Sequence, residues 1–166
     1  MRTITHTNMA ALCFVLSACG GGSDSSPPPP SATPIITSYM IDAYSSDQTA
    51  LTSDEQALLR SLAANGQLCG GAMYIDLTNL KISHVQAFVA NALSAVQADR
   101  DLGYGIDKAA ITSLFDSYQT QDLAWLDSYT WANCGISQGI LGQLETTFTP
   151  AVNSAYSAAV TQINSM

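Results

Sequence analysis

The sequence predicts an all-α domain, a compact helical bundle of about five to seven helices that spans residues 35–166. Three observations support this prediction. Apolar residues recur every three to four positions through most of the range. Signals that start and stop helices separate successive apolar stripes. No segment shows the sustained apolar–polar alternation of a half-buried strand.

The first expected helices follow from one stripe and one pair of boundary signals. The first stripe consists of Ile35, Ile36, Tyr39, Met40, Ala43 and Tyr44. Thr52 and Glu55 have the spacing of a capping box, which would start a second helix. Asn65 and Gly66 form a natural stop signal, so this second helix should end there.

The middle of the sequence contains a less certain segment and two further helices. Residues 73–80 fit either a short extended piece or part of a helix. Ser83 can cap a helix that should stop near Gly103, and Asp107 begins the next one.

The last third of the sequence predicts three more helical segments. Residues 123–129 suggest a helix that ends near residues 133–135. Ser137 can cap the helix that follows. Thr149 and Pro150 resemble another helix start, because a hydroxyl precedes a proline at the first helical position.

The N-terminus has the layout of an export signal. Arg2 provides a positive start, residues 9–16 form a short apolar run, and small residues follow. The tetrad Leu16-Ser17-Ala18-Cys19 resembles the lipobox of bacterial lipoproteins. This resemblance implies that a peptidase cuts before Cys19 and that this cysteine carries fatty acyl chains such as palmitate. Because Gly20 rather than Asp follows the cysteine, the resemblance further implies the outer membrane, facing the periplasm.

The chain therefore divides into three expected parts. Residues 1–18 are a lipoprotein signal peptide. Residues 19–34 form a lipid-anchored tether rich in Gly, Ser and Pro, which is expected to lack stable structure. Residues 35–166 form the helical domain.

Cysteine usage predicts one disulfide. Cys13 leaves with the signal peptide and Cys19 takes the lipid, so only Cys69 and Cys134 remain. Because the envelope is oxidising, these two should be joined. Two thiols and one mature histidine fall short of four zinc ligands, and we expect no cofactor.

The charge balance excludes some partners. The chain has 13 acidic against 5 basic residues and a net charge of −8. Nucleic-acid phosphates should repel such a chain, so we expect no nucleic-acid partner. Two kinds of partner remain: the membrane, through lipid on Cys19, and an envelope protein.

One short motif suggests hydrolysis. Gly135 to Gly139 match the G-x-S-x-G pattern around Ser137. The pattern normally sits on a strand-to-helix turn, with a base and an acid later in the chain. No histidine follows Ser137, and the only mature histidine, His84, lies upstream. Ser137 and His84 are therefore weak candidates for a catalytic site.

A second group of residues suggests a cation loop. Asp99, Asp101 and Asp107 lie between two expected helices, as in a calcium-binding loop, but Ala110 stands where an EF-hand needs a bidentate Glu. They are weak candidates for metal ligands. Asp122, in contrast, is expected to lie on a solvated acidic face.

Together these features predict a non-enzymatic helical module of the cell envelope that binds a protein or a small apolar ligand. The alternatives are a small hydrolase that uses Ser137 and a weak calcium-binding domain at Asp99–Asp107.

Overall fold

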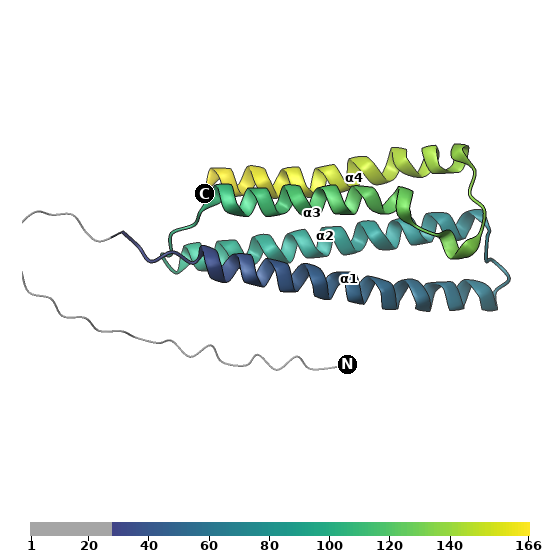
Figure 1. Ribbon diagram of the computed structural model, residues 1–166, viewed down its shortest axis with the longest axis horizontal. Helices are drawn as coiled ribbons and strands as arrows, with labels where there is room; N and C mark the ends of the chain where they lie inside the picture. Colours follow the sequence, from purple (N-terminus) through teal and green to yellow (C-terminus); the bar gives the residue numbers. More distant parts are fainter. Residues whose placement is uncertain (1–27) are drawn as a thin grey trace, which may run out of the picture.

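The computed structural model describes residues 28–166 and shows four long helices that run up and down along one axis (Figure 1). They are α1 (Thr33–Ala64), α2 (Gly71–Asp101), α3 (Lys108–Ser128) and α4 (Gln138–Ser165). A 3-10 turn, Trp131–Asn133, lies between α3 and α4. The all-α prediction is confirmed for this part of the chain. The lipobox and the first part of the expected tether lie outside the described residues.

The expected number of helices was wrong, because several start signals lie inside longer helices. The hydroxyl of Thr52 donates to the carbonyl of Gln48 (2.9 Å), and that of Ser83 donates to the carbonyl of Asn79 (2.9 Å). A serine or threonine that bonds one turn back in this way is compatible with a continuous helix. Neither residue caps a helix end.

Three further boundaries are also absent. Residues 73–80 belong to α2, and residues 123–128 continue α3. Pro150 lies inside α4, where its missing N–H removes one bond of the helical ladder. Its side chain is exposed, while the neighbouring Phe148 and Val152 are buried. Burial on both sides of the proline therefore keeps the helix in place.

Two predicted helix starts and two predicted stops are confirmed. The carboxylate of Asp107 accepts from the N–H of Ala110 (3.1 Å), and the hydroxyl of Ser137 accepts from the N–H of Ile140 (3.3 Å). Gly66 and Gly103 have φ of 67° and 85°, a left-handed conformation that favours glycine. Local signals are reliable here because each of these residues stands beside a real chain reversal.

The helices surround the core in an order that differs from their order in the chain. Helix α2 packs against α1 and α4, and α3 packs against α4 and more lightly against α1. The link from α2 to α3 therefore crosses the bundle diagonally. We call the end that holds the start of α1, the α2–α3 link and the C-terminus the tether end (Figure 1). The opposite end, with the α1–α2 loop and the 3-10 turn, is the far end.

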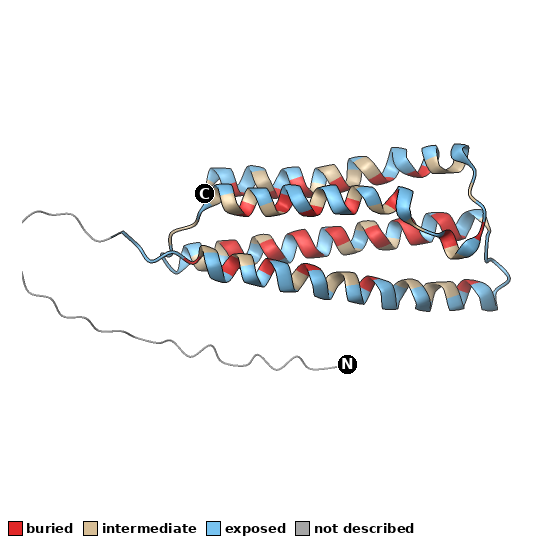
Figure 2. Ribbon diagram, in the orientation of Figure 1, coloured by how far each residue is buried: buried red, intermediate tan, exposed pale blue. Residues whose placement is uncertain are grey.

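Buried residues follow the inward side of every helix (Figure 2). In the first helix they are Ile36, Met40, Tyr44, Leu51 and Leu62. One third of the expected first stripe is nevertheless outside the core, since Ile35 and Tyr39 are 59% and 44% exposed. Residues that are three or four positions apart lie on the same broad face of a helix, but only the middle of that face contacts the neighbouring helices.

The last residues of the expected tether contact the domain. The N–H of Gly105 donates to the carbonyl of Pro30 (2.9 Å), and the N–H of Ala32 donates to the carbonyl of Gly105 (3.2 Å). The hydroxyl of Thr33 accepts from the N–H of Asp107 (2.9 Å). The chain thus enters the bundle beside the α2–α3 link, and α1 begins two residues before the expected boundary.

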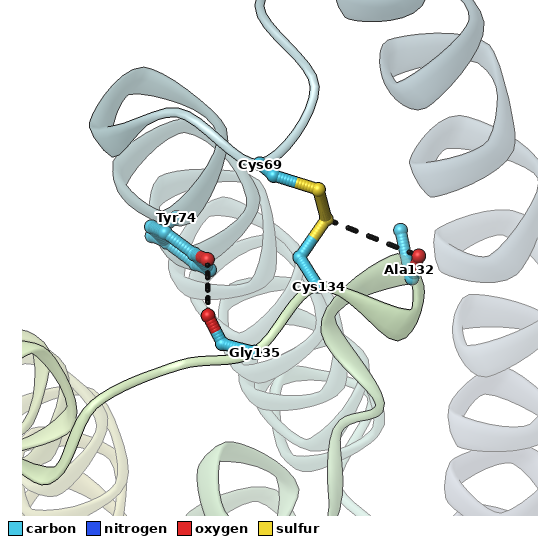
Figure 3. Close-up of a disulfide and its surroundings, with 5 residues drawn as sticks. All are labelled: Cys69, Tyr74, Ala132, Cys134 and Gly135. Atoms are coloured by element: carbon cyan, nitrogen blue, oxygen red, sulfur yellow. Dashed lines mark hydrogen bonds between the residues drawn. A yellow bond between two sulfur atoms is a disulfide. The ribbon is translucent and has the colours of Figure 1, made fainter.

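The predicted Cys69–Cys134 disulfide is present at the far end (Figure 3). It joins the α1–α2 loop to the segment that follows the 3-10 turn. Trp131, Ala132 and Asn133 have φ of 49°, 53° and 63°, values that side chains with a Cβ rarely adopt. Trp131 is nevertheless buried against other aromatic rings, and this packing, with the adjacent disulfide, holds the strained turn.

Replacing Cys69 and Cys134 together by serine is expected to lower the free energy of unfolding. The bridge closes a loop between residues 65 apart in sequence, and a loop of this size corresponds to about 4 kcal/mol of chain entropy. Urea unfolding of the oxidised protein and the double variant would measure the difference. The oxidised protein treated with a reductant should match the variant. Equal unfolding midpoints for all three samples would contradict this prediction.

Candidate functional site

A groove lies between α2 and α4 near the far end of the described surface. Its volume is about 340 Å³, at the lower end of the range for ligand pockets. It is lined by Gly71, Tyr74, Ile75, Thr78, Asn79, Ile140, Gln143, Leu144 and Thr147. None of these side chains is charged, although the protein has a net charge of −8. The groove is therefore suited to an uncharged, mainly apolar ligand.

The groove is built from regular positions on two helices. On α2, residues 71, 75 and 78 lie three to four apart, and on α4 residues 140, 144 and 147 do the same. Leu144 is buried, whereas Ile75 is 54% exposed. Neutral amide and hydroxyl groups, such as those of Asn79, Gln143 and Thr147, can form hydrogen bonds with a ligand.

A hydrogen bond and the disulfide hold this end of the groove together. The hydroxyl of Tyr74, on α2, donates to the carbonyl of Gly135 (3.0 Å), which precedes α4 (Figure 3). Gly135 directly follows Cys134, whose sulfur is bonded to Cys69. The two walls of the groove are thus connected through short covalent and polar links.

Apart from the groove, a cluster of polar side chains lies in the core and joins all four helices. The ammonium of Lys81 donates to Oδ1 of Asp122 (2.7 Å), and both side chains are 1% exposed. The hydroxyl of Tyr44 donates to the same Oδ1 (3.0 Å) and that of Tyr156 to Oδ2 (2.6 Å). Lys81 also donates to the side-chain oxygen of Gln48 (3.3 Å). We call these five residues the core network.

The core network is suited to structure rather than to catalysis. Burial, followed by the nearby charge of Asp122, raises the pKa of Tyr44 and of Tyr156, so both hydroxyls keep their protons and donate. Both carboxylate oxygens of Asp122 are thereby occupied. The charged groups and the two phenol hydroxyls are paired with one another, and only the side-chain nitrogen of Gln48 has no hydrogen-bond partner among the described residues. The network thus fixes the mutual register of the helices.

The sequence prediction for Asp122 was wrong, because Asp122 is buried rather than on a solvated face. The sequence contained an indication that Asp122 is buried, because Asp122 lies four residues after Tyr118 and four before Leu126, both of which are buried. Lys81 lies likewise four residues before the buried Val85. A charged residue at a core position is itself a sign of a buried pair.

The half-buried carboxyl group of Glu55 lies close to Trp125 and Tyr129. Burial raises the pKa of Glu55, an effect that Trp125, Lys81 and Tyr129 partly oppose. Its Oε1 atom has no hydrogen-bond partner of ordinary geometry within the described chain. Burial, then the charge of Glu55, raises the pKa of Tyr129 to about 12. Glu55 is therefore a destabilising charge at neutral pH.

The structure does not bring Ser137 and His84 together. The hydroxyl of Ser137 caps α4, and the Gly135–Tyr74 bond places this segment next to the first turns of α2. His84 lies ten residues further along α2 than Tyr74, about 15 Å away. Its Nδ1 contacts Asp47 (2.9 Å) and its Nε2 contacts Asp54 (3.2 Å), so both ring nitrogens are engaged on α1.

The three candidate calcium ligands are separated as well. Asp107 caps α3, whereas Asp99 and Asp101 lie in the last turn of α2. Among residues 28–166, no group of three His, Cys, Asp or Glu side chains is close enough to hold one ion. The described helices also include none that is long and apolar enough to cross a membrane.

Comparison with known proteins does not assign the chain to a family. No family model matches the sequence, and neither a curated protein nor a solved structure shows significant similarity.

Substitution of Lys81 by methionine is expected to lower the free energy of unfolding by about 3–5 kcal/mol, because Asp122 would remain buried without its cation. The double variant Lys81→Met/Asp122→Leu removes both charges and should recover a large part of this loss. Denaturant unfolding of the wild type, both single variants and the double variant measures the coupling. Additive losses would show that the two residues do not act as a pair.

Substitution of Glu55 by glutamine is expected to stabilise the protein at neutral pH. Because the folded-state pKa is raised, the wild type loses stability as the pH rises from 4.5, the ordinary value, through the raised pKa. Glutamine keeps an acceptor but cannot ionise. The gain should stay below about 1 kcal/mol, since water screens this partly exposed group.

Unfolding measured across the acidic and neutral range would test this prediction. The two proteins should be equally stable well below pH 4.5 and diverge above it. Glu145→Gln is the matched control, because Glu145 is an exposed residue on α4. A constant difference between Glu55→Gln and wild type at every pH would contradict the assignment.

Proposed function

We propose that this protein is a lipid-anchored module of the bacterial cell envelope that binds an apolar segment of a partner protein in the groove between α2 and α4. Lipid on Cys19 holds it on the outer membrane, and the helical domain faces the periplasm. The uncharged lining of the groove supports the proposed binding role. The lipobox and the disulfide between Cys69 and Cys134 support the location.

The chemistry of the groove favours a protein segment over a charged metabolite. A charged ligand would need an opposite charge, and none lines the groove. Apolar side chains of a partner can cover Ile75, which is 54% exposed. The amides of Asn79 and Gln143 can pair with the peptide groups between those side chains.

The position of the groove also suits a partner away from the anchor. Ile75 on α2 lies 26 residues before the end of that helix at Asp101, which corresponds to about 39 Å along the helix axis. The chain enters the bundle at the opposite, tether end. A segment of another envelope protein can thus reach the groove without approaching the bilayer.

Binding is favoured over hydrolysis by the geometry of the weak catalytic candidates. Ser137 is occupied as a helix cap, and His84 contacts two carboxylates on α1. A hydrolytic site needs the nucleophile and its base within hydrogen-bond reach. A calcium site would need carboxylates that converge, and Asp99, Asp101 and Asp107 do not.

Site-specific photocrosslinking in cells would test the groove. A benzophenone amino acid is placed at Ile75, and at Ile41 as the matched control. Both are isoleucines on helices, 54% and 53% exposed, and Ile41 lies on α1 away from the groove. We expect a discrete crosslinked protein from position 75 only, and its loss when Leu144 is replaced by arginine. Crosslinks that are absent, or equal at both positions, would overturn the proposed groove.

A further inference from the structure

The tether end of the bundle carries an exposed apolar patch that the proposed binding role does not use. Ile35 and Tyr39, on the first turns of α1, are 59% and 44% exposed, and Leu102 and Tyr104 in the α2–α3 link are 72% and 40% exposed. Of the large apolar residues that are exposed in the described chain, Leu102 is the most exposed. We call these four residues the tether-end patch.

Two members of the patch lie on α1, and the other two lie just beyond the end of α2, which packs against α1. Ile35 and Tyr39 line one shallow hollow together with Ala95, Ala98 and Asp99 of α2. Leu102 lies seven residues after Ala95 and four after Ala98, which places it on the same face of α2. The N–H of Tyr104 donates to the carbonyl of Asp99 (3.2 Å), so Tyr104 follows directly beyond this face.

We propose that the tether-end patch rests on the surface of the bilayer that holds the lipid anchor. This inference depends on the proposed lipid on Cys19, but not on the groove. Tyrosines with an apolar ring and a polar hydroxyl, beside exposed aliphatic residues, suit the boundary between lipid headgroups and acyl chains.

The length of chain before the bundle places the patch within reach of the bilayer. Pro28, the first described residue, lies nine positions after Cys19. Even a fully extended segment of this length spans no more than roughly 30 Å. Pro30 and Ala32 then bond to Gly105, next to Tyr104. The patch thus lies beside the point where the anchored segment enters the bundle, within reach of the bilayer.

The charges near the patch indicate which kind of lipid headgroup it can contact. Asp99 lines the hollow, and Asp101 lies in the same turn of α2. With a net charge of −8, the protein should be repelled by anionic headgroups. We therefore infer that the patch contacts a zwitterionic lipid surface by apolar burial, an interaction that salt should not weaken.

The test uses the full lipidated chain, reconstituted into phosphatidylcholine vesicles that contain a doxyl-labelled lipid as quencher. An environment-sensitive fluorophore is attached to Leu102→Cys, and in a second sample to Gln67→Cys, an exposed position in the far-end loop. We expect the protein to float with the vesicles, and lipid quenching at position 102 to exceed that at position 67 several-fold. The double substitution Ile35→Gln/Tyr39→Gln should remove this excess, whereas Ile41→Gln should not.

Each other outcome has a defined meaning. Flotation with equal quenching at positions 102 and 67 overturns the patch and leaves the lipid anchor intact. Failure to float overturns the anchor and the patch together, independently of crosslinking at the groove. The fluorophore at position 102 could instead become shielded as the protein concentration rises, without being quenched by the labelled lipid. This result would show that a second copy of the chain covers the patch, and it would also overturn the proposal.

Discussion

The ion pair between Lys81 and Asp122 is the interaction on which the arrangement of the bundle depends. Apolar packing alone allows helices to slide or rotate by small amounts at little cost, whereas a buried charge must be paired at one position. Tyr44, Lys81, Asp122 and Tyr156 come from α1, α2, α3 and α4, respectively, and meet at one carboxylate. A shift of any helix by one turn would leave a charge or hydroxyl without its partner.

The core network and the disulfide act at different places in the bundle. The network fixes the register in the interior, while the Cys69–Cys134 bond holds the far end, where the chain adopts a left-handed turn. The groove between α2 and α4 lies next to the far end, where the disulfide and the Tyr74–Gly135 hydrogen bond connect its two walls. A groove with fixed walls loses little conformational entropy when a ligand enters it, which favours binding.

Five of the seven large apolar residues that are exposed in the described chain have a role in the two proposals, and Ile41 and Leu68 do not. Ile75 lies at the groove near the far end, and the tether-end patch lies near the point where the chain enters. In the proposed function, anchoring at one end and binding at the other would separate attachment from recognition. This division is consistent with the uncharged lining of the groove and with the acidic residues beside the patch.

The sequence by itself determined the helical class, the disulfide and the boundaries at Gly66, Gly103, Asp107 and Ser137. These features depend on local backbone chemistry, or on two cysteines that are the only ones within residues 35–166. Only the tertiary structure decided that Thr52, Ser83 and Pro150 lie inside helices, because burial of the flanking apolar residues outweighs a local start signal. It also decided the pairing of Lys81 with Asp122 and the lining of the groove. The ion pair and the groove each bring together residues that lie far apart in the chain. The spacing of apolar residues shows which face of a helix is buried, but not which other helix packs against that face.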